Sequence, residues 1–332
     1  MTYPNSSPSP AARLAAMALL LSLAACGGGD DGPPPIISGT AMKGVLKNAL
    51  VTASELKAGG APVAIGSACT GNDGAFSVTY SGYTGGPILL KVQPVANPSG
   101  CKGNNLPTTT VCDVAAGCGT GIDFGDTFTV TPASGISLHA LVENAAPVAM
   151  ITPFTELAAR NAMRLAGNPG DLDTVDLSAL SAADLLRIKA TAREAREQLE
   201  NLPALAGINL LTTVPPDITK PFPTGSAAQN DAATYAALCA GVLGAYIGDG
   251  GSTADPGAAI DAAVDKLVAS FGDGGIPNND SVSGNDATTT SLAELIAAAR
   301  TAAAGSEVPG YDDSSLDSQD SVIAGNPGGS SN

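Results

Sequence analysis

Hydrophobic and polar residues alternate with a period of two in three stretches of the first half of the chain: 76–80, 88–92 and 136–142. Strict alternation predicts β-strands with one buried face, so the polar partners in 136–142, including His139, are expected on the exposed face. Asn72-Asp73-Gly74 supplies residues that tolerate positive φ, which predicts a tight hairpin turn before 76–80. No long helical pattern interrupts residues 36–151, which favours mostly antiparallel sheets packed as a sandwich.

From residue 152 the apolar positions recur every three or four residues, the period of an amphipathic helix. Thr152-Pro153 and Ser181-x-x-Asp184 are typical helix starts. Arg193/Glu197 and Arg196/Glu200 are four residues apart on the second of these helices, so we expect a solvated face of ion pairs there rather than a partner site. The remaining apolar faces lie around 235–246, 255–271 and 291–299. The pattern predicts about five helices in a small bundle.

These patterns predict a multi-domain α+β protein, in which an antiparallel Greek-key β-sandwich precedes a small all-α helical bundle. The expected segments, in chain order, begin with a signal peptide (1–25) and a Gly/Pro linker (26–35). They continue with a β-sandwich (36–151) that has a cysteine-containing insertion at 94–126, a helical domain (152–304) and a disordered Gly/Ser/Asp-rich tail (305–332).

An uncharged apolar run from Leu14 to Ala25 lies near the N-terminus, directly after Arg13 and directly before Cys26. A helix that crosses a bilayer needs about 20 apolar residues. A run this short is typical of the apolar middle of a signal peptide.

Leu23-Ala24-Ala25-Cys26 resembles the lipobox of bacterial lipoproteins. The resemblance implies that the Cys26 thiol carries a covalent lipid, that the leader is cut before it, and that the new amino group is often acylated. Two or three acyl chains anchor a protein stably, because each buried methylene contributes about 0.8 kcal/mol. In that family an Asp after the cysteine tends to retain the protein in the inner membrane. Gly27 therefore implies a lipid-anchored position at the cell outer membrane, facing the periplasm or the surface.

A second resemblance covers about residues 36–93. Ser38-Gly39-Thr40, Gly44-Val45, 48–53 and 71–78 together resemble the carboxypeptidase regulatory-like domain. The resemblance implies a prealbumin-like Greek-key β-sandwich that generally has no catalytic residues of its own. This sequence has Leu46-Lys47-Asn48 where the pattern often has proline.

The β region contains four cysteines: Cys69, Cys101, Cys112 and Cys118. Export places them in an oxidising compartment, where thiols pair. Of the three pairings that four cysteines allow, we favour Cys69–Cys101 with Cys112–Cys118, because the second pair closes a short loop. The alternative is a metal site, but no CxxC pair and no neighbouring histidine supply zinc spacing. Cys239 lies in an apolar helical face and is expected to be a buried, unpaired thiol.

The net charge of −16 disfavours nucleic acid and anionic lipid as partners. His139 is the single histidine, so a two-histidine zinc motif is excluded, and no GxSxG elbow, phosphate loop or dinucleotide fingerprint is present. No catalytic residue is identified. His139 could serve in catalysis, but its place on the polar side of a strand favours an ordinary surface position. Asp273, Asp280 and Asp286 are weak calcium candidates, but EF-hand spacing is missing and a polar loop is the simpler interpretation.

The expectation is a non-catalytic, membrane-anchored envelope lipoprotein with a binding or structural role, its partner an envelope protein or a glycan. A second hypothesis is a carboxylate-based hydrolase or carbohydrate-active surface protein, since the 31 acidic residues supply many candidate carboxyl pairs. A third hypothesis is a calcium-dependent surface module.

Overall fold

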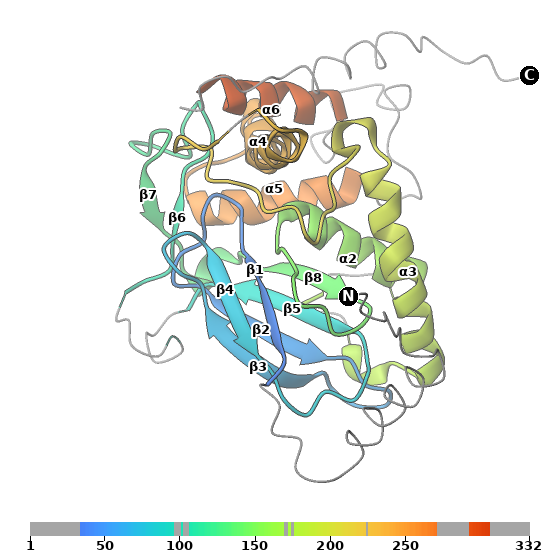
Figure 1. Cartoon of the computed structure of the whole chain (residues 1–332). Coiled ribbons are helices and arrows are strands. Elements are labelled where there is room, and N and C mark those ends of the chain that lie inside the picture. Colours follow the sequence, from blue (N-terminus) through green and yellow to red (C-terminus); the bar gives the residue numbers. More distant parts are fainter. Residues whose placement is uncertain are drawn as a thin grey trace, which may run out of the picture. The chain divides into compact units, whose positions relative to one another are not determined.

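The computed structural model describes residues 34–95, 101, 106–168, 172–173, 176–223, 225–270 and 292–305. The chain divides into two units, Met1–Pro34 and Pro35–Asn332, and the second contains nearly all of the described residues. Its described part is α+β: antiparallel sheets are followed by five α-helices, as the periodicities predict. In Figure 1, α4, α5 and α6 lie at one end, the main strands lie at the other, and α3 runs along one side between them.

A four-stranded antiparallel sheet forms the centre of the β region. Its strands, in spatial order, are β3 (Val63–Cys69), β2 (Leu50–Glu55), β5 (Ile88–Gln93) and β8 (Leu138–Val142). The register of the last pair sets Lys91 directly opposite His139. Two polar residues therefore share one face of the sheet, near the end of the predicted β region.

A second, two-stranded sheet pairs β1 (Ile36–Thr40) with β4 (Ala75–Thr79). Residues 147–151 run parallel to β1, since the amide of Ala149 donates to Ser38 O and that of Ile151 donates to Thr40 O. A Cβ atom on Gly39 would lie 1.9 Å from Ala149 O, so this close approach requires glycine. A third sheet pairs β6 (Thr109–Val111) with β7 (Thr127–Thr129).

The predicted turn at Asn72-Asp73-Gly74 is present, but it does not close a paired hairpin. Gly74 has φ +75°, and the amide of Ala75 donates to Asp73 Oδ1. The strands on either side belong to different sheets, because β3 pairs with β2 and β4 pairs with β1. The turn therefore carries the chain from one sheet to the other.

Every residue of β8 is buried, which corrects the expectation of one exposed face. Leu138, Ala140 and Val142 belong to the core shared with β1 and β4. Leu141 belongs to a second core, which α2 and α3 supply on the opposite side of the sheet. His139, expected at the surface, is consequently 1% exposed. Alternation along the strand could not reveal the helices that cover its polar side.

The five helices are α2 (Pro153–Leu165), α3 (Ala182–Glu200), α4 (Ala227–Gly248), α5 (Pro256–Ser270) and α6 (Leu292–Gly305), with short 3₁₀ turns at Pro132–Ser134, Leu177–Ala179 and Pro203–Leu205. Helices α2 and α3 begin at the predicted caps, Thr152 and Ser181, and each of these residues takes part in a capping box. Gly167, with φ +89°, follows the end of α2. The caps fix where each helix begins, and so which side chains face the sheet.

Helix α4 is long and apolar enough to cross a membrane by length and composition. However, 67% of its apolar window is buried inside the protein. It packs against α5 and α6, and Tyr235, Leu238 and Val242 lie in the main core. This environment is that of the core helix of a globular unit.

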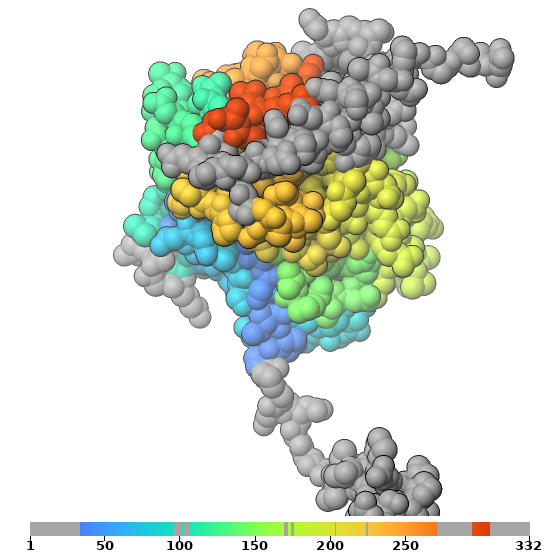
Figure 2. Space-filling model, turned by 45° about the horizontal axis from the view of Figure 1, so that its top comes forward, coloured from blue at the N-terminus to red at the C-terminus, as the bar shows by residue number. Residues whose placement is uncertain are grey.

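The hydrophobic core continues across residue 151, where the sequence predicts a boundary between two domains. Phe154 and Leu157 of α2 and Leu238 of α4 share one core with β-region residues such as Ile37 and Val51. Figure 2 shows the surfaces of the strand and helix regions meeting directly. Residues 35–332 form one unit because α2 packs directly on β8.

Candidate functional site

Five charged side chains meet where α2 covers the sheet, and we call them the His139 cluster. They are Lys91 from β5, His139 from β8, Glu156 and Arg160 from α2, and Asp173 from the segment after α2. The His139 side chain is 1% exposed and that of Glu156 is fully buried. Charges buried as deeply as those of His139 and Glu156 require mutual pairing, while Lys91 and Asp173 lie at the partly exposed edge of the cluster.

The cluster forms a chain of ion pairs around the imidazole. His139 Nδ1 lies 2.8 Å from Glu156 Oε2, and His139 Nε2 lies 3.4 Å from Asp173 Oδ1. Arg160 Nε donates to Glu156 Oε1, and Lys91 Nζ donates to Asp173 Oδ1. Arg160 also reaches Asp265 of α5, with 2.8 Å between Nη1 and Oδ1. The cluster thus ties the sheet to α2, to α5 and to the segment after α2.

Local backbone contacts hold Glu156 in place. The N-terminus of α2 is capped by Thr152, whose Oγ1 accepts from the amide of Thr155. Thr155 Oγ1 donates to the carbonyl of His139 at 3.0 Å, and the amide of His139 donates to Glu156 Oε2. The first turn of α2 is therefore hydrogen-bonded to β8 at the residue that carries the imidazole.

The charges set the protonation state of the imidazole. Burial by itself lowers the pKa of His139, but the carboxylates of Glu156 and Asp173 outweigh it and raise the pKa to about 9. His139 and Arg160 hold the pKa of Glu156 below its ordinary value against the effect of burial. His139 and Lys91 do the same for the pKa of Asp173. At neutral pH the cluster consists of cations and anions in contact.

This arrangement favours a structural role for His139. A general base needs a neutral nitrogen and room for a substrate proton. Here the imidazole is a cation, Nδ1 faces Glu156, and Nε2 faces Asp173 at an ion-pair distance. The cluster neutralises buried charge and joins four parts of the chain.

Raising the pH should weaken the protein between about pH 6.5 and pH 9. The pKa of His139 is raised in the folded state, so its contribution to stability is complete below pH 6.5 and is lost as the pH passes through about 9. The loss is about 3 kcal/mol, because each pH unit across that interval is worth about 1.36 kcal/mol. Urea unfolding at a series of pH values measures it.

His139 is the single histidine of the chain, which makes the assignment of that pH dependence direct. His139→Gln should show a nearly flat profile between about pH 6.5 and pH 8, below the range in which the Cys239 thiol ionises in the unfolded chain. A slope of equal size in that variant would contradict the assignment.

A second buried carboxylate, Glu55, organises the loop before β5. Its side chain is 0% exposed. Its Oε1 accepts from the amide of Gly86 at 2.7 Å and from Oγ1 of Thr84 at 2.9 Å. These hydrogen bonds keep the pKa of Glu55 below its ordinary value, against the opposing effect of burial. Glu55 is an ionised carboxylate that fixes a turn.

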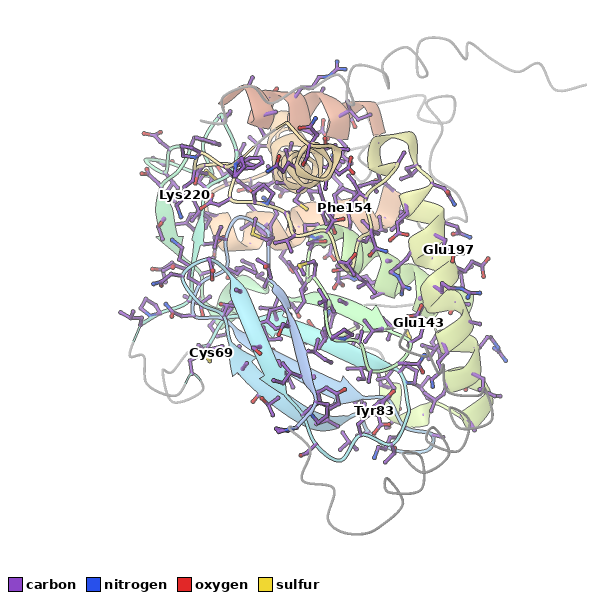
Figure 3. All side chains as sticks on the ribbon, viewed as in Figure 1. Cys69, Tyr83, Glu143, Phe154, Glu197 and Lys220 are labelled. Atoms are coloured by element: carbon purple, nitrogen blue, oxygen red, sulfur yellow. A yellow bond between two sulfur atoms is a disulfide. The ribbon has the colours of Figure 1, made fainter. Side chains whose placement is uncertain are left out.

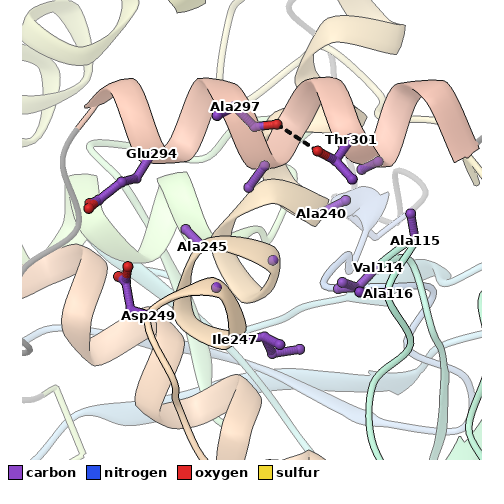
Figure 4. Close-up of a pocket in the computed structure, with 14 residues that line it drawn as sticks. Val114, Ala115, Ala116, Ala240, Ala245, Ile247, Asp249, Glu294, Ala297 and Thr301 are labelled. Atoms are coloured by element: carbon purple, nitrogen blue, oxygen red, sulfur yellow. Dashed lines mark hydrogen bonds between the residues drawn. The ribbon is translucent and has the colours of Figure 1, made fainter.

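An apolar pocket of about 410 Å³ lies between α4, α6 and the loop at 114–116 (Figure 4). Most lining side chains are small, such as Ala240, Ala298 and Val114. In Figure 4, Asp249 and Glu294 lie at the end opposite Ala115 and Ala116. Asp249 is bound by Lys266 of α5. The pocket suits an apolar group of modest size.

The structure places the predicted cysteine pairs at bonding distance. The Sγ atoms of Cys69 and Cys101 are 2.08 Å apart, and those of Cys112 and Cys118 are 2.11 Å apart. This is the pairing that the sequence analysis favours. Cys239 is buried and unpaired, and burial raises the pKa of its thiol.

The other predicted site residues are the lipid attachment point and the calcium candidates. Cys26 and the calcium candidates Asp273, Asp280 and Asp286 lie outside the described residues. Within the described part of the chain, no group of three or more His, Cys, Asp or Glu side chains is arranged to hold a metal ion.

The charged face of α3 is partly as predicted. Arg193 pairs with Glu197 at 3.5 Å, on the outward side of the helix (Figure 3). Arg196 does not pair with Glu200 as expected. It binds Glu143 at the end of the sheet, with 2.6 Å between Nη2 and Oε1, while Glu200 accepts from the amide of Leu210. Tertiary contacts replaced the helical pair because both side chains face neighbouring segments.

The role of Glu156 could not be found from sequence, because nothing distinguishes it among 31 acidic residues. The one signal was His139, a lone imidazole in a strand. No family model matches the chain, and the comparisons with curated proteins and with solved structures likewise find no match.

Proposed function

We propose that the chain is a lipid-anchored protein of the cell envelope, with a binding or structural role and no catalytic centre. The anchor would be Cys26 of the LAAC motif, and the location the cell outer membrane. A Gly/Pro linker would hold the folded unit off the membrane. Its partner would be an envelope protein or a glycan, since the acidic chain repels nucleic acid.

The observation that carries the proposal is the pair of cystines. Both S–S contacts are at bonding distance, and cysteines pair in this way in exported proteins rather than in the reducing cytosol. An N-terminal apolar run that ends in a lipobox-like motif supplies the export route. The two features are independent, because one is a leader pattern and the other is a property of the folded unit.

We further propose that residues 36–151 are a prealbumin-like Greek-key sandwich of the carboxypeptidase regulatory-like type. The supporting observations are the antiparallel sheet order β3-β2-β5-β8 and the β1–β4 pair, whose apolar residues share one core. The resemblance implies a domain that generally has no catalytic residues of its own, which agrees with a role that is not catalytic.

The hydrolase hypothesis is favoured less than binding. A carboxylate-based hydrolase needs a carboxylic acid with a raised pKa. In the described part of the chain, the carboxyl groups with a clearly shifted pKa all have it lowered: Glu55, Glu156, Asp173, Asp176, Asp184 and Asp217. These groups are ionised partners in hydrogen bonds and ion pairs.

Cys26→Ser should move the protein from the membrane fraction to the soluble fraction, because the lipid attachment sulfur is absent. Fractionation of cells followed by immunoblotting measures the distribution. Cys239→Ser is the matched control: it removes a thiol in the core of the folded unit and should leave the protein on the membrane. Retention of the Cys26 variant on membranes would contradict the anchor.

A further inference from the structure

Lys43 and Asp113 form an ion pair in the interior of the folded unit. Lys43 Nζ lies 2.7 Å from Asp113 Oδ1, and the two side chains are 1% and 8% exposed. The residues are 70 positions apart, and they lie just after β1 and β6 respectively. We propose that these side chains condense into an intramolecular amide bond, a covalent cross-link between the two segments.

The buried ammonium of Lys43 has fewer hydrogen-bond acceptors around it than it has N–H groups. Among the described residues, Asp113 Oδ1 is the one hydrogen-bond acceptor that Nζ contacts, although an ammonium has three N–H groups to satisfy. A buried ion pair with unsatisfied donors is held against a large desolvation penalty. An amide at the same place has no net charge and a single N–H, so the reaction removes the unfavourable charge.

The contacts of the Asp113 carboxylate indicate which oxygen would stay as the amide carbonyl and which would leave as water. Asp113 Oδ2 accepts from the amide of Gly44 at 2.8 Å, while Oδ1 faces the amine. Proton transfer from Nζ to Oδ1 gives a neutral amine and a carboxylic acid. The amine nitrogen then forms a bond to Cγ of Asp113, and the developing oxyanion at Oδ2 is stabilised by the Gly44 N–H. A second amine proton passes to the Oδ1 hydroxyl, the Cγ–Oδ1 bond breaks, and one water leaves.

The backbone holds both reactants rigidly. Gly44 has φ +58°, and a Cβ atom there would lie 2.1 Å from Val111 O, so the segment after β1 fits tightly against β6. Thr110 Oγ1 donates to the carbonyl of Lys43 at 2.9 Å. Well-oriented groups react with effective molarities of roughly 10⁵–10⁸ M, so holding the amine against the carboxyl group favours the condensation.

The cross-link would sit where a force from the membrane enters the fold. The proposed linker leads directly into β1, and Lys43 lies three residues beyond the end of that strand. A covalent bond to the segment after β6 would keep the intervening strands closed when the N-terminus is pulled. This consequence depends on the proposed anchor, whereas the bond itself does not.

Peptide mapping of the purified full chain tests the bond. After reduction of the disulfides and cleavage at acidic residues, we expect one branched peptide that joins Lys43 to Asp113. It should be uncut at Asp113, because that carboxyl group is in the amide, and lighter than its two parts by one water. Asp30 and Asp31 separate Lys43 from the lipidated Cys26 in such a digest. Recovery of only linear peptides from the unaltered protein, with the chain cut at a free Asp113, would overturn the proposal.

Lys43→Arg retains the positive charge but replaces the nucleophilic amine with a guanidinium, so the branched peptide should be absent. Lys189→Arg makes the same exchange at a lysine that contacts Gly85 O and Asn144, and should leave the branched peptide intact. A cross-link that persists in Lys43→Arg would also contradict the assignment. Because the mass of the unaltered chain decides the question, poor folding of a variant does not affect the test.

Discussion

Glu156→Gln should lower the free energy of unfolding by about 3–5 kcal/mol, the largest effect that we expect from a single substitution. The carboxylate is fully buried and contacts His139 through Oε2 and Arg160 through Oε1. Glutamine has nearly the same shape but no charge, so it leaves the cationic imidazole and the guanidinium without their shared counter-charge. Urea unfolding followed by circular dichroism at neutral pH measures the loss.

Glu197→Gln is the matched control for this prediction, because it makes the same chemical change on an exposed helix face. The Glu197 side chain is 59% exposed and its pair with Arg193 is 3.5 Å long. A surface pair of this kind contributes about 0–1 kcal/mol. If the two variants lost similar stability, burial would not be the reason for the importance of Glu156.

Replacing both Cys69 and Cys101 with serine should lower the free energy of unfolding by about 3–4 kcal/mol. The bond closes a loop with a sequence separation of 32 residues, and the loss of that closure gives the unfolded chain more conformational freedom. It also releases the end of β3, where Cys69 is the last residue. Thermal and urea unfolding without reductant measure the change.

The double variant of Cys112 and Cys118 provides the comparison. Its bond spans a sequence separation of 6, so the same reasoning gives a loss of about 2 kcal/mol. Equal losses from the two double variants would contradict the loop-length argument and would indicate that local packing decides the contribution of each disulfide.

Local signals in the sequence predicted the elements well. The period-two stretches became β4, β5 and β8, and the five helical patterns became α2 to α6. The cap of α3 is a clear case, since Ser181 and Asp184 form the reciprocal hydrogen bonds that their spacing predicts. Such features depend on residues within one turn of each other, so the sequence alone contains the necessary information.

Interactions between distant residues were not predictable in the same way. The Asn72-Asp73-Gly74 turn is present, yet the strands on either side of it, β3 and β4, belong to different sheets because β4 pairs with β1. Arg196 pairs with Glu143, directly after β8, and not with Glu200, the partner that the helical spacing predicts. Nothing in the local pattern ranks these long-range partners.

The sequence by itself determined three of the strands, the five helices, the net negative charge and the choice of cysteines available for pairing, and it predicts a leader that ends before Cys26. Only the tertiary structure decided that His139 is buried, that Glu156 is its partner and that Lys43 meets Asp113. The physical reason is burial by a second layer. A strand pattern shows which residues are apolar. It does not show that a helix from elsewhere in the chain will exclude water from a polar residue such as His139, and this burial is what makes its charge depend on ion-pair partners.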